Sequence, residues 1–174
     1  MEPAAAAATP VLEPLTIQES LLRLVAAAVC GALLGFNREQ HGKPAGLKTL
    51  TLVSVGAASF MLVSLELFLA VPDTDVGVSR VDLTRVVQGV VGGIGFLGAG
   101  SIIRARGAVV GTTTAATIWT VGAIGLACGL GNYRLALLVT AVAWMILVGF
   151  GFVERKWLAP HGDRPPRRDE PPTS

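Results

Sequence analysis

The sequence is poor in charged residues. Asp, Glu, Lys and Arg make up only 15% of its 174 residues, whereas a soluble domain carries about a quarter. Between Arg85 and Arg134 the only charged residues are Arg104 and Arg106. Helices in this region cannot present the polar outer face that a water-soluble bundle needs, which argues against a soluble fold.

Residues that carry catalysis or bind metals are also scarce. The two histidines, His41 and His161, fall in a loop and in the tail, and the two cysteines, Cys30 and Cys128, fall inside apolar segments. Such cysteines are typical of small core side chains, and no disulfide framework is indicated. There are no paired acids, no Ser–His pair and no metal-ligand spacing. We therefore expect no enzyme activity, no metal site and no cofactor.

Basic residues are dispersed, and the formal net charge is only +2. No basic patch with interleaved aromatic residues is present, so a nucleic-acid partner is not expected. No Lys or Arg precedes the apolar stretch that begins at Leu21, so we expect no cleaved signal peptide. We predict disorder for residues 1–16 and for the Pro- and charge-rich tail 158–174, with one transmembrane domain over 17–157.

Long apolar runs are abundant. Hydrophobic residues make up 52% of the chain, and the mean hydropathy is +0.62. A membrane-spanning helix needs roughly 20 residues, and five segments approach that length: 17–36, 50–71, 86–103, 109–131 and 135–153. The first is the weakest because Arg23 interrupts it. The alternation of a β-barrel is absent, so we predict an all-α membrane protein with a bundle of about five transmembrane helices.

The distribution of basic residues predicts the orientation. With five spans, the first loop, the third loop and the tail share one side and hold ten basic residues, against three on the other side. Basic residues in short loops mark the cytoplasmic side. We therefore predict a multi-pass protein with its N-terminus outside and its C-terminus inside.

Glycines are dense in the apolar segments. GxxxG pairs occur at Gly31/Gly35, Gly89/Gly93 and Gly125/Gly129, and the third segment continues with Gly95, Gly98 and Gly100. Small residues at this spacing let membrane helices pack closely. A broken helix lining a cavity is the alternative interpretation.

Polar residues mark three further candidate sites. The loop 37–49 is a positive-inside loop with a turn, or a site for a partner or an anionic group; its candidate residues are Arg38, Glu39, Lys43, Pro44, Gly46, Lys48 and Thr49. Arg23, Glu66 and Gln88 lie at membrane depth. Arg23 and Glu66 either pair with each other or reach the interface separately. The hydroxyls of Thr113 and Thr114 are suited to hydrogen bonds within or between helices.

Several of these motifs resemble the MgtC/SapB family. They are residues 31–39 (GALLGFNRE), 42–49 (GKPAGLKT), 93–100 (GIGFLGAG), and 111–119, which ends at Trp119. Their order and spacing agree over roughly residues 17–157. The chain departs from the family pattern at Asn37, at Lys48 and Leu50, and at Thr112. The better-studied members also carry a soluble C-terminal domain, whereas only a short tail follows Lys156 here.

The resemblance implies a bacterial inner-membrane protein with a five-helix domain. Family members are associated with adaptation to low magnesium and with survival inside host cells, and some are thought to restrain the proton-translocating ATP synthase. We expect a non-enzymatic protein, in the lipid bilayer, that contacts other membrane proteins, with ATP synthase subunits as candidates, or that forms a homo-oligomer. The alternative is a small Mg²⁺ or cation transporter, which would use Glu66.

Overall fold

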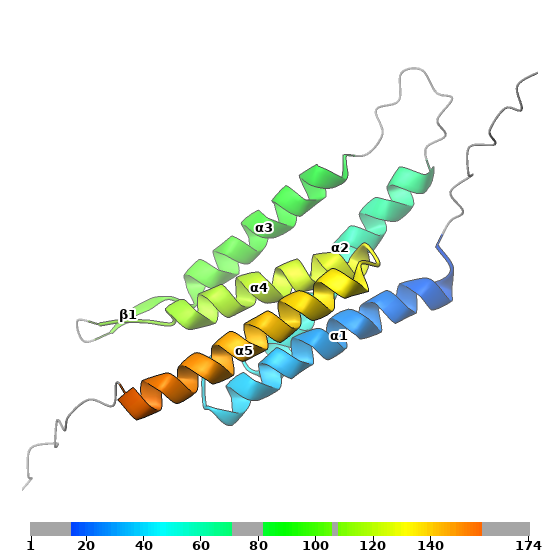
Figure 1. The fold of residues 1–174 in the computed structure, drawn as a ribbon. Coiled ribbons are helices and arrows are strands. Elements are labelled where there is room, and N and C mark those ends of the chain that lie inside the picture. Colours follow the sequence, from blue (N-terminus) through cyan, green and yellow to red (C-terminus); the bar gives the residue numbers. More distant parts are fainter. Residues whose placement is uncertain (1–14, 71–81, 106–107, 158–174) are drawn as a thin grey trace, which may run out of the picture.

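A computed structural model describes residues 15–70, 82–105 and 108–157. In these residues, five helices and one short hairpin form the fold. The elements are α1 (Ile17–Gln40), α2 (Leu47–Ala70), α3 (Leu83–Gly100), β1 (Ile103–Ala105), β2 (Ala108–Val110), α4 (Thr112–Gly129) and α5 (Tyr133–Trp157). Successive helices run in opposite directions along one bundle (Figure 1). The predicted all-α membrane fold is confirmed. The predicted disordered ends lie outside the described residues, except for Leu15 and Thr16.

Side-chain oxygens cap the starts of several helices. Thr16 and Glu19 form a capping box at α1, with the Glu19 carboxylate accepting from the Thr16 backbone N–H at 2.9 Å. The Asp82 carboxylate accepts hydrogen bonds from the Thr84 hydroxyl and backbone N–H, which together hold the pKa of Asp82 below its usual range. Such caps satisfy backbone N–H groups that have no partner inside the helix.

Four of the five helices are long and apolar enough to cross a membrane: α1, α2, α3, and α5 over Tyr133–Gly151. The predicted fourth span corresponds to α4, which does not belong to this group. It has 18 residues, the same number as α3, so its composition and not its length sets it apart, because five of those residues are threonines. Most of its side chains are buried, so its composition is that of an interior helix.

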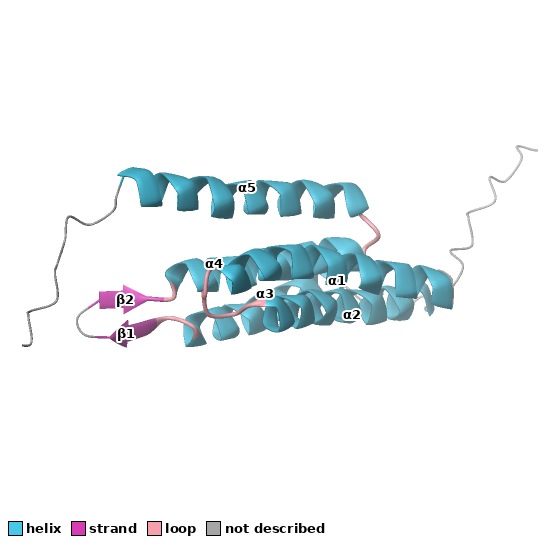
Figure 2. Ribbon diagram, turned by 90° about the horizontal axis from the view of Figure 1, so that it is seen from below, coloured by secondary structure: helices cyan, strands magenta, loops and turns pink. Residues whose placement is uncertain are grey.

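The helix α4 is the centre of the bundle. It contacts each of the other four helices, and Val121, Ile124 and Cys128 on it are fully buried in the core. The helices α3 and α5 lie on different sides of α4, and α5 stands apart from the layer that contains α2 and α3 (Figure 2). The helix α5 exposes most of its apolar side chains, and α3 exposes Val91, Phe96 and Leu97, as is expected of surfaces that face lipid.

Glycines bring α1 and α2 into close contact. A Cβ atom added at Gly31 would lie 2.8 Å from the Ser54 Cβ, and one added at Gly35 would lie 2.7 Å from the Leu47 Cα. No side chain fits at such distances. The Gly31/Gly35 pair therefore sets the separation of these two helix backbones.

The Gly125/Gly129 pair of α4 packs against the same helix. A Cβ at Gly129 would lie 2.7 Å from the Ala58 carbonyl oxygen, and one at Gly125 would collide with the Ser54 carbonyl oxygen. The glycines of α3 differ. A Cβ added at Gly98 would lie 3.5 Å from the Ala115 carbonyl oxygen of α4, an ordinary contact distance, whereas a Cβ at any other glycine of α3 would meet nothing within 4 Å.

A β-hairpin separates α3 from α4, and the sequence did not predict it. The predicted third span ended at Ile103 and the predicted fourth span began at Val109. In the structure these residues belong to the strands β1 and β2, where Ile103 pairs with Val110 and Arg104 pairs with Val109. The Ser101 hydroxyl donates to the Gly98 carbonyl at 2.7 Å and helps to end α3. Gly111 has a φ of +94°, a backbone conformation that favours glycine, and it turns the chain from β2 into α4.

We predict that Gly125→Ala destabilises the protein by about 1–3 kcal/mol, because the new methyl group has no room against the α2 backbone. Gly92→Ala is the matched control. Its methyl group meets open space, and alanine favours the helix, so stability should stay equal or rise by up to about 1 kcal/mol. Thermal unfolding in detergent measures both variants. Equal stability of the two would contradict the close α2–α4 packing.

Candidate functional site

The most unusual polar residue is Arg38, in the last turn of α1. Its side chain is only 3% exposed. Its guanidinium donates to the Thr114 hydroxyl at 2.5 Å and to the Thr117 hydroxyl at 3.4 Å, both on α4. It also donates to the Pro44 carbonyl at 3.0 Å. Arg38 therefore joins α1, the α1–α2 loop and α4 at one end of the bundle.

Burial leaves the charge of Arg38 incompletely compensated. Its Nε atom is buried and has no hydrogen-bond partner, and no carboxylate among the described residues forms an ion pair with it. The Pro44 carbonyl and the negative C-terminal end of the α1 dipole offer only partial charges. A buried cation without a counter-ion is costly and is usually functional in a membrane protein.

The neighbouring residue, Glu39, has a different role. Its carboxylate accepts a hydrogen bond from the Leu47 backbone N–H at 2.6 Å, so it caps the start of α2. A Cβ at Gly46 would collide with this carboxylate, so a side chain at that position would displace the Glu39 cap. Because Glu39 is held at the N-terminus of α2, it does not neutralise Arg38.

The remaining candidate residues of segment 37–49 and of α4 have exposed side chains. Lys43, Lys48 and Thr49 are exposed. Thr113 is also exposed, and its carbonyl accepts from the Thr117 hydroxyl at 2.7 Å. Trp119 is 54% exposed on α4 and does not contribute to the Arg38 cluster. Gly93, Gly95 and Gly100 face open space on α3.

The polar residues at membrane depth do not form a site. Arg23 donates to the Gly129 carbonyl at 2.7 Å and so caps the C-terminus of α4 at the other end of the bundle. Glu66 and Gln88 are exposed. The ion pair between Arg23 and Glu66 that the sequence allowed is not formed. Among the residues that the structure describes, no three His, Cys, Asp or Glu side chains gather to hold a metal ion.

The sequence named Pro44 and Thr114 as candidate residues but missed Thr117, and it linked none of the three to Arg38. The spacing of Thr114 and Thr117 carries a partial signal, because residues three apart share one face of a helix. Nothing in the sequence connects that face to Arg38, which is 76 and 79 residues away.

We predict that Thr114→Val destabilises the protein by roughly 1–3 kcal/mol. The change conserves volume but leaves a buried guanidinium N–H without its acceptor. Thr112→Val is the control, because Thr112 is exposed on the same turn of α4. Thermal unfolding of the two variants in the same detergent checks this. Identical unfolding temperatures would show that Arg38 does not depend on Thr114.

Comparison with known proteins gives a consistent picture. The MgtC family model matches residues 24–156. Protein SrpB of Synechococcus elongatus is 40% identical over 152 residues, which cover 82% of this chain and 81% of SrpB. "Putative magnesium transporter YhiD" of Escherichia coli K12 is 40% identical over 133 residues, or 76% of this chain and 60% of YhiD.

Protein MgtC of Salmonella typhimurium is 42% identical over 122 residues, which cover 70% of this chain and 48% of that protein. The chain thus spans about half the length of MgtC and three fifths of YhiD. No solved structure matches. The apolar helices and these relatives agree that the protein is embedded in a membrane, and the extent of the match over residues 24–156 shows that the chain belongs to the MgtC family.

Proposed function

We propose that this protein is a non-enzymatic modulator that binds a transmembrane helix of another membrane protein in the groove between α2 and α3. The observation that supports the proposal most directly is an open, glycine-lined surface on α3. A Cβ at Gly89 or Gly93 would meet nothing within 4 Å, and the same holds for Gly56 on α2.

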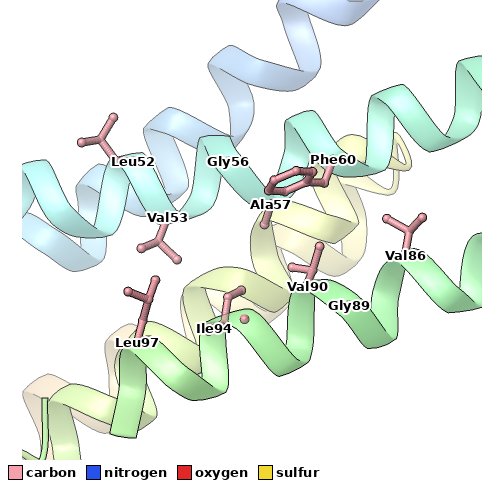
Figure 3. A pocket seen from close by; sticks show the side chains of 11 residues that line it. Leu52, Val53, Gly56, Ala57, Phe60, Val86, Gly89, Val90, Ile94 and Leu97 are labelled. Carbon is pink, nitrogen blue, oxygen red and sulfur yellow. The ribbon is translucent and has the colours of Figure 1, made fainter. Parts of the chain in front are cut away.

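The groove between α2 and α3 has a volume of about 670 Å³ and is lined by apolar side chains and glycines. Val53 and Phe60 of α2 and Val90 and Leu97 of α3 surround the space between the two helices (Figure 3). No residue that lines it is charged. A transmembrane helix has the matching chemistry, because its surface is apolar and it packs best on small residues.

The cost of glycine supports a role for this surface. Each glycine in a helix interior costs roughly 1 kcal/mol relative to alanine. On α1 and α4 the pairs Gly31/Gly35 and Gly125/Gly129 gain close packing against α2. The open glycines of α3 gain no packing against the part of the chain that the structure describes. Contact with a partner protein would explain why glycine stands at these positions.

The family and the distribution of basic residues support a biological setting for this protein. We infer a multi-pass protein of the bacterial inner membrane, with its N-terminus outside, that acts in magnesium homeostasis. The family resemblance makes ATP synthase subunits the first partners to test. A second copy of this chain is another partner with the same helix chemistry.

Cation transport has less support. The name of YhiD describes that relative as a putative magnesium transporter, but Mg²⁺ prefers carboxylates and retained waters. Glu66 is a single exposed acid on α2, and no cluster of metal-binding side chains forms in the described ranges. Mg²⁺ flux into liposomes with purified protein, lost on Glu66→Gln, would overturn the modulator proposal.

We predict that Gly93→Leu reduces crosslinking to membrane-protein partners by about tenfold or more in native membranes. The leucine side chain fills the groove, and a misfit of 1.4 kcal/mol corresponds to about tenfold in affinity. Mass spectrometry of the crosslinked adducts gives the measurement.

Gly95→Leu is the matched control, because Gly95 lies on α3 in open space but does not line the groove. The control should retain the adducts of the unmodified protein. If Gly93→Leu and Gly95→Leu gave equal amounts of crosslinked adducts, the partner would not bind in the α2–α3 groove.

A further inference from the structure

The β1–β2 hairpin exposes the large apolar side chains that it carries. Ile103 and Val109 are each 59% exposed, and Val110 and the preceding Ile102 are exposed as well. A cluster of exposed apolar side chains on so short an element is unusual on a surface that faces water. Such a cluster marks a contact with lipid or with another protein.

The strand pairing places apolar side chains on both faces of the hairpin. Ile103 lies opposite Val110 on one face, and Arg104 lies opposite Val109 on the other, because side chains alternate between the faces of a strand. A protein that docked on one face would leave the apolar side chain on the other face in water. Exposure on both faces therefore favours an apolar medium around the hairpin over a single protein surface.

The hairpin lies at the end of the bundle where α3 completes its span. It follows Gly100, the last residue of a helix long and apolar enough to cross a membrane. Arg38 in the last turn of α1 bonds to Thr114 in the first turn of α4, so the hairpin lies level with the α1–α2 loop or beyond it. Figures 1 and 2 show it at the same end of the bundle as the C-terminus of α5.

The backbone of the hairpin limits how deep in the bilayer it can lie. Within the described part of the chain, the two strands form a sheet of their own, so each strand keeps an outer edge of N–H and C=O groups without a strand partner. Open sheet edges do not occur in the hydrocarbon core, where no water can bond to them. The headgroup region suits both the open edges and the exposed apolar side chains.

Arg104 gives the hairpin a positive charge. It is exposed, and no carboxylate among the described residues forms an ion pair with it. The sequence holds no Asp or Glu between Asp82 and Glu154, so no neighbour along the chain neutralises this charge. Basic residues at this level of a membrane protein are attracted to anionic phospholipids.

We propose that the β1–β2 hairpin inserts into the headgroup region of the bilayer at this end of the bundle. Val109 and Val110 contact the ends of the acyl chains next to the headgroups, and Arg104 donates hydrogen bonds to the phosphate of an anionic phospholipid. This contact continues the apolar surface of α3, where Phe96 is 79% exposed. Phe96 and the hairpin do not line the α2–α3 groove, so the proposal stands or falls independently of partner binding.

Spin labels on introduced cysteines test the proposal in the purified full chain, reconstituted in phosphatidylcholine vesicles. The labelled variants are Val110→Cys on the hairpin, Phe96→Cys on the exposed surface of α3 and Lys43→Cys in the α1–α2 loop. Cys30 and Cys128 are buried, so the unmodified protein serves as the blank for labelling. Collisions with oxygen, which concentrates in lipid, and with a neutral water-soluble nickel chelate report the environment of each label.

We expect the ratio of oxygen to nickel collisions for the Val110 label to fall between the high ratio at Phe96 and the low ratio at Lys43. Nickel collisions as frequent at Val110 as at Lys43 would place the hairpin in water and overturn the proposal. A Val110 label that neither reagent reaches would also overturn it, because a protein surface would then cover the hairpin. Ile103→Cys, on the same face, repeats the test if Val110→Cys does not fold.

The charge of Arg104 is tested by the lipid composition. Replacing phosphatidylcholine by phosphatidylglycerol of the same acyl chains should shift the hairpin toward the inserted state by about fivefold, the contribution of one basic residue at a membrane surface. Nickel collisions at the Val110 label should therefore become rarer.

Arg104→Gln should abolish this response to phosphatidylglycerol. Arg134→Gln is the matched control, because it removes the same charge from an exposed residue at the start of α5, at the other end of the bundle. This variant should respond as the unmodified protein does. The headgroup contact is overturned if phosphatidylglycerol has no effect on the unmodified hairpin, or if the two variants respond alike.

Discussion

The structure depends on the close contact of two glycine pairs with one helix. Gly31 and Gly35 of α1, and Gly125 and Gly129 of α4, all lie against the backbone of α2. In lipid there is little hydrophobic drive between helices, so the fit of their surfaces decides which helices associate. This contact makes α1, α2 and α4 the packed centre of the bundle and leaves α3 and α5 outside.

The polar contacts at the two ends of this core reinforce the arrangement. Arg38 bonds from α1 to Thr114 of α4 at one end, and Arg23 bonds from α1 to the Gly129 carbonyl at the other. In contrast, α3 buries only Ile94 and Gly98. A helix with so little burial and so many open glycines is suited to pack against a transmembrane helix of another protein.

Apolar length and glycine spacing predicted the helices well, because both are local properties. They could not predict the hairpin, since the short apolar runs at Ile103 and Val109 are as compatible with a helix as with a strand. They also could not show that α4 is an interior helix rather than another lipid-facing span.

Arg38 was predicted as a loop residue of the cytoplasmic side. The structure continues α1 to Gln40 and buries Arg38 through contacts far away in the sequence.

The central claim is that the α2–α3 groove accommodates a helix of a partner. Photocrosslinking in native membranes tests it most directly, with a photoreactive residue at Val90 in the groove and, for comparison, at Leu138, which is 65% exposed on α5. The account predicts protein adducts from Val90 and lipid adducts from Leu138. Lipid adducts alone from both positions would contradict it.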